Sequence, residues 1–146
     1  MNGSLSKESL ERYYELCLLI HRTCNVITQT CWSELKGHGV SSAAAMVLFL
    51  IQSMGGEAGP TELSRLLFRR PHSVYELLGR MEKSGIVRKP RRPETKRKGT
   101  IRFELTEKGL QLYTQLSSRE NVAKLMSRLS EQDLRRLKSY LEAILE

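Results

Sequence analysis

The sequence lacks any run of about 18 apolar residues, the length that a membrane-spanning helix needs. Its N-terminus has no basic start followed by an apolar block and a small-residue cleavage site, so we expect no secretion signal. The chain has only 3 cysteines and no CxxC pair, and an odd number is a poor basis for a disulfide framework. These absences predict a cytoplasmic protein.

The motifs of the common enzyme classes are also absent. The histidines, His21, His38 and His72, are scattered, and there is no Gly-rich phosphate loop, HExxH zinc motif or GxSxG nucleophile motif. Nothing in the sequence brings together a nucleophile, a base and an orienting group. We therefore expect a protein that is not an enzyme and that needs no cofactor and no metal.

Positive charge, by contrast, is abundant and concentrated. The net charge is +8, and residues 69–102 carry twelve Lys and Arg against three Glu, a local net of +9, which leaves about −1 for the rest of the chain. A basic segment on a near-neutral body is typical of phosphate binding. A solvated charged surface and an anionic membrane surface are the alternatives, although the segment has β rather than amphipathic-helix character.

Apolar periodicity predicts a mainly α-helical chain. A long helix is expected from about Leu5 to Lys36, where apolar residues recur at steps of three and four without Pro or Gly. Ser41 or Ser42 can cap a second helix that runs to Met54. This second helix is apolar almost all round, so we expect it to be buried.

Two short helices joined by a tight turn predict a helix-turn-helix in the middle of the chain. Thr61 is expected to cap the first, ELSRLLF, and Pro71 suits the first position of the second, PHSVYELLGRMEKSG, which Gly85 ends. The inner face of the second helix consists of Val74, Leu77, Leu78 and Met81. Its outward residues and the arginines at the turn are candidates for contacts in a DNA major groove. These candidates are Arg69, Arg70, His72, Ser73, Tyr75, Glu76 and Arg80.

A basic β-hairpin, or wing, is expected directly after this helix. Ile86 and Val87 begin one strand, and TIRFEL, with its alternating pattern, forms the other. The loop between them is expected to reach the adjacent minor groove, where arginine reads groove width. The candidate wing contacts are Arg91, Arg92, Lys96, Arg97 and Lys98.

The helices at both ends carry more apolar surface than a winged helix-turn-helix needs. Thr106 is expected to start a long helix through Met126, and Ser130, with Asp133 three residues on, starts the last helix. An apolar stripe that one chain cannot cover needs a partner chain, most commonly in a two-fold dimer. The expected dimerisation residues are Leu5, Leu10, Tyr13, Leu134, Leu137, Leu141, Ile144 and Leu145.

The predicted fold is therefore mainly α with a small β-hairpin. We expect an N-terminal dimerisation helix at 1–40, a winged helix-turn-helix domain at 41–106 and C-terminal dimerisation helices at 107–146. A winged-helix module that binds RNA or another protein is the main alternative to a DNA-binding dimer.

The order of these elements resembles the MarR family of bacterial and archaeal regulators. The resemblance covers nearly the whole chain and rests most on TELSRLL (61–67), SVYELLGRMEKSGIVRK (73–89) and FELTEKG (103–109). It implies a homodimer that binds a pseudo-palindromic operator in the nucleoid, usually as a repressor. The family wing commonly carries an Asp that holds the minor-groove Arg, whereas RRPETKRKG at 91–99 has none. Which of Lys96, Arg97 and Lys98 enters the groove is left open.

The same resemblance implies release from DNA by a small, often aromatic effector. The effector candidates that it implies are His21, Cys24, Thr28, Trp32 and Met46. Three interpretations compete for the stripe of Cys17, Cys24 and Cys31 on the first helix, namely core packing, redox sensing and metal sensing. For the redox interpretation, Cys17 matches the reactive cysteine of the peroxide-sensing branch of the family.

Overall fold

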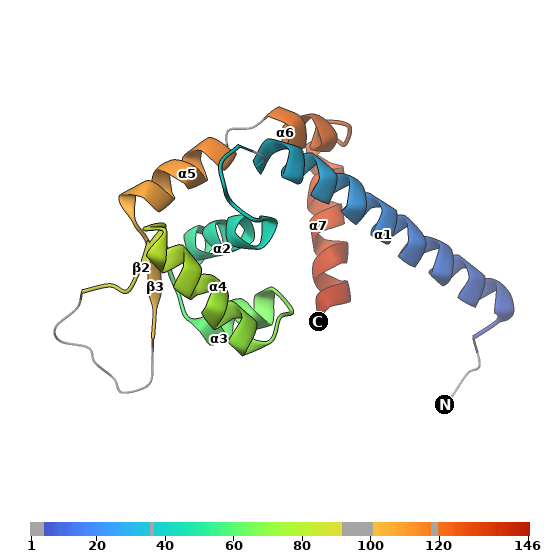
Figure 1. Ribbon diagram of the computed structural model, residues 1–146. Helices are drawn as coiled ribbons and strands as arrows, with labels where there is room; N and C mark the ends of the chain where they lie inside the picture. The colour runs from blue at the N-terminus through green and yellow to red at the C-terminus, as the bar shows by residue number, and fades with distance from the viewer. Residues whose placement is uncertain (1–4, 36, 92–100, 118–119) are drawn as a thin grey trace. The chain divides into compact units, whose positions relative to one another are not determined.

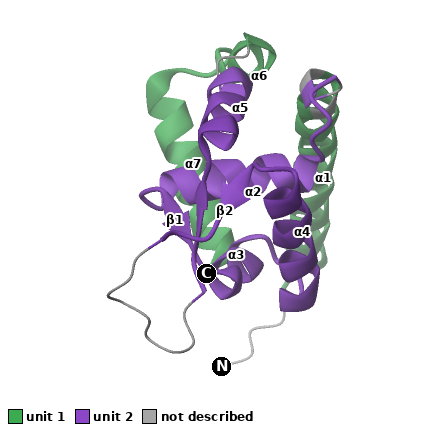
Figure 2. Ribbon diagram, turned by 60° about the vertical axis from the view of Figure 1, so that its left-hand side comes forward, with its two compact units in different colours: residues 1–34, 120–146 green, residues 35–119 purple. Residues whose placement is uncertain are grey.

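The computed structural model describes residues 5–35, 37–91, 101–117 and 120–146, with the side chains of Trp32 and Glu34 left undescribed. These ranges contain seven helices and a small antiparallel sheet. They form two compact units, residues 1–34 with 120–146 and residues 35–119 (Figure 2). The mainly α fold with a small β element, predicted from the sequence, is confirmed.

The second unit is the winged helix-turn-helix (Figure 1). Its elements are α2 (Ser42–Ser53), β1 (Glu57–Ala58), α3 (Pro60–Leu66), α4 (Pro71–Lys83), β2 (Val87–Arg88), β3 (Phe103–Leu105) and α5 (Glu107–Ser117). The strands lie in the order β1-β3-β2, with Ala58 opposite Phe103 and Val87 opposite Leu105. The predicted pairing of β2 with β3 is confirmed, whereas β1 was not predicted.

The core of this unit forms around α2. Leu48 and Ile51 of α2, Leu63 of α3 and Val74 and Leu78 of α4 are fully buried. The four residues predicted as the inner face of α4 are all buried, which confirms the helical period there. The expectation that α2 is buried all round was wrong, because one side of it, including Met46 and Phe49, is exposed.

Hydrogen-bonded caps fix most helix starts as predicted. Ser41 Oγ accepts from the Ala44 N–H at 3.2 Å, and Ser130 Oγ accepts from the Asp133 N–H at 3.1 Å. Thr61 is not the cap of α3, because Pro60 already occupies the first helical position and Gly59 precedes it. The Glu62 carboxylate accepts from the Gly59 N–H at 2.9 Å and takes over the capping.

The TEKG sequence after β3 locks α5 onto the end of α4. Thr106 Oγ1 accepts from the Gly109 N–H at 3.0 Å, which confirms it as the cap of α5. Lys108 Nζ donates to the Ser84 carbonyl at 2.7 Å. A Cβ at Gly109 would lie 2.1 Å from the Ile86 carbonyl oxygen, so only glycine fits this close approach.

The first unit consists of α1 (Lys7–Leu35, whose last residue belongs to the other unit), α6 (Glu120–Met126) and α7 (Glu131–Leu145). α5 is described to Ser117 and α6 from Glu120, so the continuity of the single helix predicted from Thr106 to Met126 depends on residues 118–119, which lie outside the described residues. No helix within the described ranges is long and apolar enough to cross a membrane.

Candidate nucleic-acid interface

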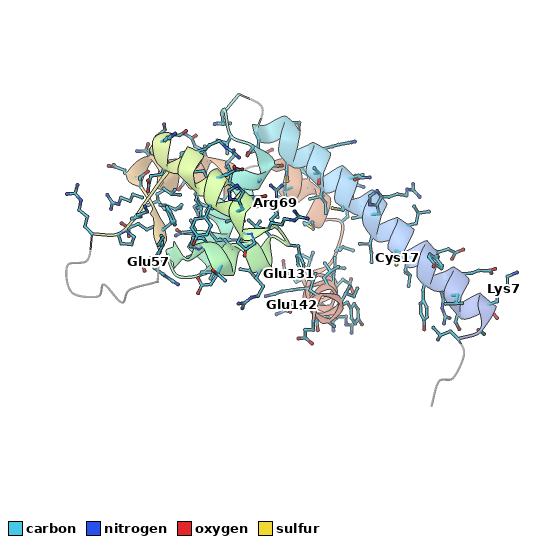
Figure 3. All side chains as sticks on the ribbon, turned by 60° about the horizontal axis from the view of Figure 1, so that its bottom comes forward. Lys7, Cys17, Glu57, Arg69, Glu131 and Glu142 are labelled. Carbon is cyan, nitrogen blue, oxygen red and sulfur yellow. The ribbon has the colours of Figure 1, made fainter. Side chains whose placement is uncertain are left out.

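The turn between α3 and α4 brings two arginines to the start of α4. The Arg69 N–H donates to the Ser64 carbonyl at 3.0 Å and closes the end of α3. Phe68 takes a positive φ of 50° to make this turn, which is uncommon for a residue with a bulky side chain. Arg69 and Arg70 are exposed beside the N-terminus of α4, where a helix dipole favours anions (Figure 3 labels Arg69).

The outward face of α4 carries every recognition residue that the sequence predicted. His72, Ser73, Tyr75, Glu76 and Arg80 are all exposed, while the opposite face is buried in the core. His72 Nε2 lies 3.2 Å from Glu76 Oε1, one helical turn along, and both side chains face solvent. One face of α4 therefore exposes hydrogen-bonding side chains, while the opposite face packs in the core.

The wing candidates are described only in part. Arg91 is exposed, whereas Arg92, Lys96, Arg97 and Lys98 lie outside the described residues. At the base of the wing, Arg88 Nε donates to Glu104 Oε1 at 2.8 Å across the β2–β3 pair. Arg102, just before β3, donates to both carboxylate oxygens of Glu62, at 3.1 and 3.0 Å. The structure therefore pairs two of the segment's cations with carboxylates of unit 2, which the charge count alone did not reveal.

The candidates on α1 stay predictions. Cys17 and Cys24 are exposed free thiols, and Cys31 is half-buried (Figure 3 labels Cys17). His21 and Thr28 are also exposed, and the side chain of Trp32 lies outside the described part of the chain. Among the described residues, no group of three or more His, Cys, Asp and Glu side chains is arranged to hold a metal ion.

An aromatic pair next to Met46 was not predicted from the sequence. Phe49 of α2 and Tyr113 of α5 form a T-shaped contact, with ring centroids 5.1 Å apart and an interplanar angle of 64°. Met46 lies one turn before Phe49 and is exposed. The spacing of Met46 and Phe49 was visible in the sequence, but their contact with α5 depends on the fold.

Solved structures provide a close match to this architecture. The organohalide-sensing RdhR-CbdbA1625 transcriptional regulator matches in its 2,4-dichlorophenol-bound form at 26% identity and a TM-score of 0.71, over 99% of this chain and 85% of that one. Its ligand-free form matches at 25% identity and the same TM-score and coverage. A mutant of MarR from E. coli complexed with operator DNA matches at 22% identity and a TM-score of 0.72, over 92% and 96%. The chain has the fold of the MarR-type regulators.

The MarR-type fold confirms the resemblance read from the sequence, including the order helix, helix, helix-turn-helix, wing and terminal helices. No family model matches the chain, and no curated protein matches it. The matched structures are those of transcriptional regulators, and one of them was solved with operator DNA.

Proposed function

We propose that this chain is a homodimeric, sequence-specific double-stranded DNA-binding regulator that acts as a repressor. The observation that carries the proposal is the two-sided α4, buried on its apolar face and exposed on its polar face, with cations at its start. Such a helix can lie in a major groove without unfolding any part of the core. The operator complex of a MarR mutant from E. coli supports this use of the fold.

We assign the proposed DNA contacts by the charge and the hydrogen-bonding groups of each side chain. Arg69 and Arg70, beside the positive end of α4, suit backbone phosphates. His72, Ser73 and Tyr75 offer donors, and Glu76 offers an acceptor that fits the amino group of cytosine. The wing residues Arg91, Arg92, Lys96, Arg97 and Lys98 are proposed to contact the neighbouring minor groove.

The dimer is proposed from uncovered apolar side chains. Leu137, Tyr140, Leu141, Ile144 and Leu145 follow one side of α7 and are all exposed. Leu5, Leu10 and Tyr13 are likewise exposed, and Leu134 is half-buried. Residues 1–40 and 107–146 of two chains would cover these surfaces and leave 41–106 to bind one operator half-site each.

The effector is proposed to be a small aromatic molecule. The matched RdhR-CbdbA1625 regulator was solved with 2,4-dichlorophenol, which supports this ligand class. In unit 2, the exposed Met46 and the Phe49–Tyr113 pair offer apolar and aromatic contacts to such a ligand, and His21, Cys24, Thr28 and Trp32 of α1 stay the candidates that the sequence resemblance implies. The exposed thiol of Cys17 supports oxidative release as the second candidate.

DNA binding is tested by titrating a labelled duplex from upstream of the protein's own gene at several salt concentrations. Arg97→Ala/Lys98→Ala is expected to weaken binding and to lower the salt slope by about one unit for each lost phosphate contact. Lys138→Ala, which removes an exposed cation of α7, is the matched control and should leave the slope unchanged. A single-chain species that ignores duplex DNA in dilute buffer would overturn the proposal, and preference for single-stranded RNA would favour the alternative module.

Effector class is tested on the same complex with chlorinated phenols and with peroxide. Release by a phenol that Met46→Ala weakens, with Cys17→Ser unaffected, is the expected result. Release by peroxide that a thiol reverses and Cys17→Ser abolishes would instead establish redox sensing.

A further inference from the structure

Arg102 is the most heavily engaged cation in the described part of unit 2. Its Nη1 donates to both oxygens of Glu62, at 3.1 and 3.0 Å, and its Nη2 donates to the Glu57 carbonyl at 3.3 Å. Its Nε also lies 3.8 Å from Glu57 Oε2. One guanidinium therefore connects the entry to β3 with β1 and with the first turn of α3, elements more than 35 residues away in sequence.

A hydrogen bond from the backbone holds the Glu62 carboxylate in place independently of Arg102. Its Oε2 accepts from the Gly59 N–H at 2.9 Å, which holds the carboxylate at the N-terminus of α3. This hydrogen bond lowers the pKa of Glu62 below its ordinary value, and Arg102 lowers it further against the opposing effect of partial burial. The carboxylate thus stays ionised at neutral pH and serves both as a helix cap and as the anchor of Arg102.

Gly59 and the β1–β3 pair lie directly beside these groups. Gly59 lies beneath the ion pair, where a Cβ would come 3.4 Å from the Ile101 carbonyl oxygen and 3.7 Å from Glu62 Oε2. In the β1–β3 pair, Glu57 lies opposite Glu104 and Ala58 opposite Phe103. Glu57 therefore takes part both in this strand pair and in the contact with Arg102. Arg102 is about one-third exposed and contacts its carboxylate partners directly, unlike Arg69, Arg70 and Arg91, which are exposed.

We propose that Arg102, Glu62 and Glu57 form a clamp that positions the wing relative to the recognition helix. The clamp ties β3, the strand through which the wing rejoins the core, to α3, which packs directly against α4. With both elements held, α4 and the wing present their contacts to DNA as one preorganised surface. In this role Arg102 does not bind phosphate, although it belongs to the basic segment. The proposal rests on the proposed DNA-binding function.

Glu62→Gln separates this role from simple electrostatics. The change makes the protein one unit more positive, so electrostatic attraction alone predicts tighter binding to DNA. The clamp predicts the opposite, a loss of about tenfold in affinity, because the neutral amide holds Arg102 less strongly. Since Gln can still accept from the Gly59 N–H, the cap of α3 is retained. Arg102→Gln is expected to weaken binding at least as much.

The matched control is Arg88→Gln, which removes a more exposed cation at the same end of the wing from its pair with Glu104. It should lower the salt slope by no more than about one unit, the effect of one phosphate contact. Arg102→Gln should lower it further, because wing contacts are lost together. Hydroxyl-radical footprints should lose the minor-groove protection next to each half-site, whereas protection of guanine N7 from dimethyl sulfate in the major groove should be kept.

Two measurements keep the test decisive. Thermal unfolding of each variant shows whether weaker binding reflects an unfolded fraction at the assay temperature. Hydrogen exchange at Phe103, Glu104 and Leu105 in the free protein should speed up in Glu62→Gln and not in Arg88→Gln. Glu62→Gln binding as tightly as the wild type, with an unchanged footprint, would overturn the clamp. Failure of the wild type to bind any duplex would overturn the proposed function, and the exchange rates would still decide whether the clamp holds β3.

Discussion

The two units of this chain differ in how much of their apolar surface they bury. Every buried apolar residue among those described belongs to residues 35–119, where the helix-turn-helix and the sheet enclose them. The other unit buries none of its described residues, although α1 and α7 are rich in Leu, Ile and Tyr. The winged unit therefore carries its own core, whereas the terminal helices carry a surface that is suited to a partner.

The largest effect is expected from a cavity in the winged unit. Leu78→Ala removes a fully buried side chain of α4 and should lower the free energy of unfolding by about 2–5 kcal/mol. Leu78→Met, which nearly conserves volume, should cost less than about 1.5 kcal/mol. Urea denaturation followed by circular dichroism measures both. Equal losses for the two variants would show that this site is not tightly packed.

A smaller effect is expected where α5 meets the residue that follows α4. Gly109→Ala places a Cβ 2.1 Å from the Ile86 carbonyl oxygen, so the backbone must shift, at a cost of about 1–3 kcal/mol. Gly79→Ala is the matched control, since no atom lies within 4 Å of the added Cβ on the exposed side of α4. That change should raise the stability by about 0.5–1 kcal/mol, because alanine is the better helix former. Destabilisation by both changes would point to a general intolerance of alanine in this unit.

For an exposed apolar residue of α7, we expect little change in the stability of a single chain and a larger change in dimer formation. Ile144 is 67% exposed in one chain, so Ile144→Asp should change the stability of a single chain by no more than about 0.5 kcal/mol. The same change should raise the dissociation constant of the proposed dimer at least about tenfold, which sedimentation equilibrium measures. Ser139→Asp adds the same charge to an exposed position of α7 outside the apolar stripe. If both variants dissociate equally, charge and not the apolar stripe controls assembly.

The sequence predicted what depends on local spacing. The inner face of α4, the Ser41, Thr106 and Ser130 caps and the end of α4 at Gly85 follow from a 3.6-residue period and from hydrogen bonds three residues apart. The predicted contacts on α4 are exposed as expected, and their roles stay predictions. Val74, Leu77 and Leu78 lie about one helical turn apart, so their spacing alone predicts which face of α4 is buried.

What the sequence missed depends on long-range pairing. β1 is only two residues long and exists because Glu57 and Ala58 pair with Glu104 and Phe103 of β3, which lie 47 and 45 residues later. The partners of Arg102 are equally distant, so a count of charges placed it with the phosphate-binding residues. The exposure of the side of α2 that carries Met46 and Phe49 also depends on which elements the fold leaves uncovered.

The smallest expected effect compares ion pairs in the two units. The folded state lowers the pKa of Glu62, so its stabilisation is present above its ordinary pKa of 4.5 and is lost as the pH falls through the lower folded value. A double-mutant cycle of Glu62→Gln and Arg102→Gln should therefore give a coupling of about 0.5–1 kcal/mol at pH 7, discounted for solvent exposure, that fades as the pH falls through the lowered pKa of Glu62.

The matched cycle uses Lys138 and Glu142 of α7, whose charged atoms lie 3.7 Å apart with both side chains mostly exposed. A pair of this kind on a helix surface contributes only about 0.3–0.5 kcal/mol and is screened by salt. Urea unfolding at pH 7 and at pH 3, with and without 0.5 M salt (about a 4 Å screening length), measures both couplings. Because Arg102 also bonds the Glu57 carbonyl, its pair should resist salt better than the pair on α7. Equal salt sensitivity would mean that the clamp is an ordinary surface contact and that the two units differ only in their apolar cores.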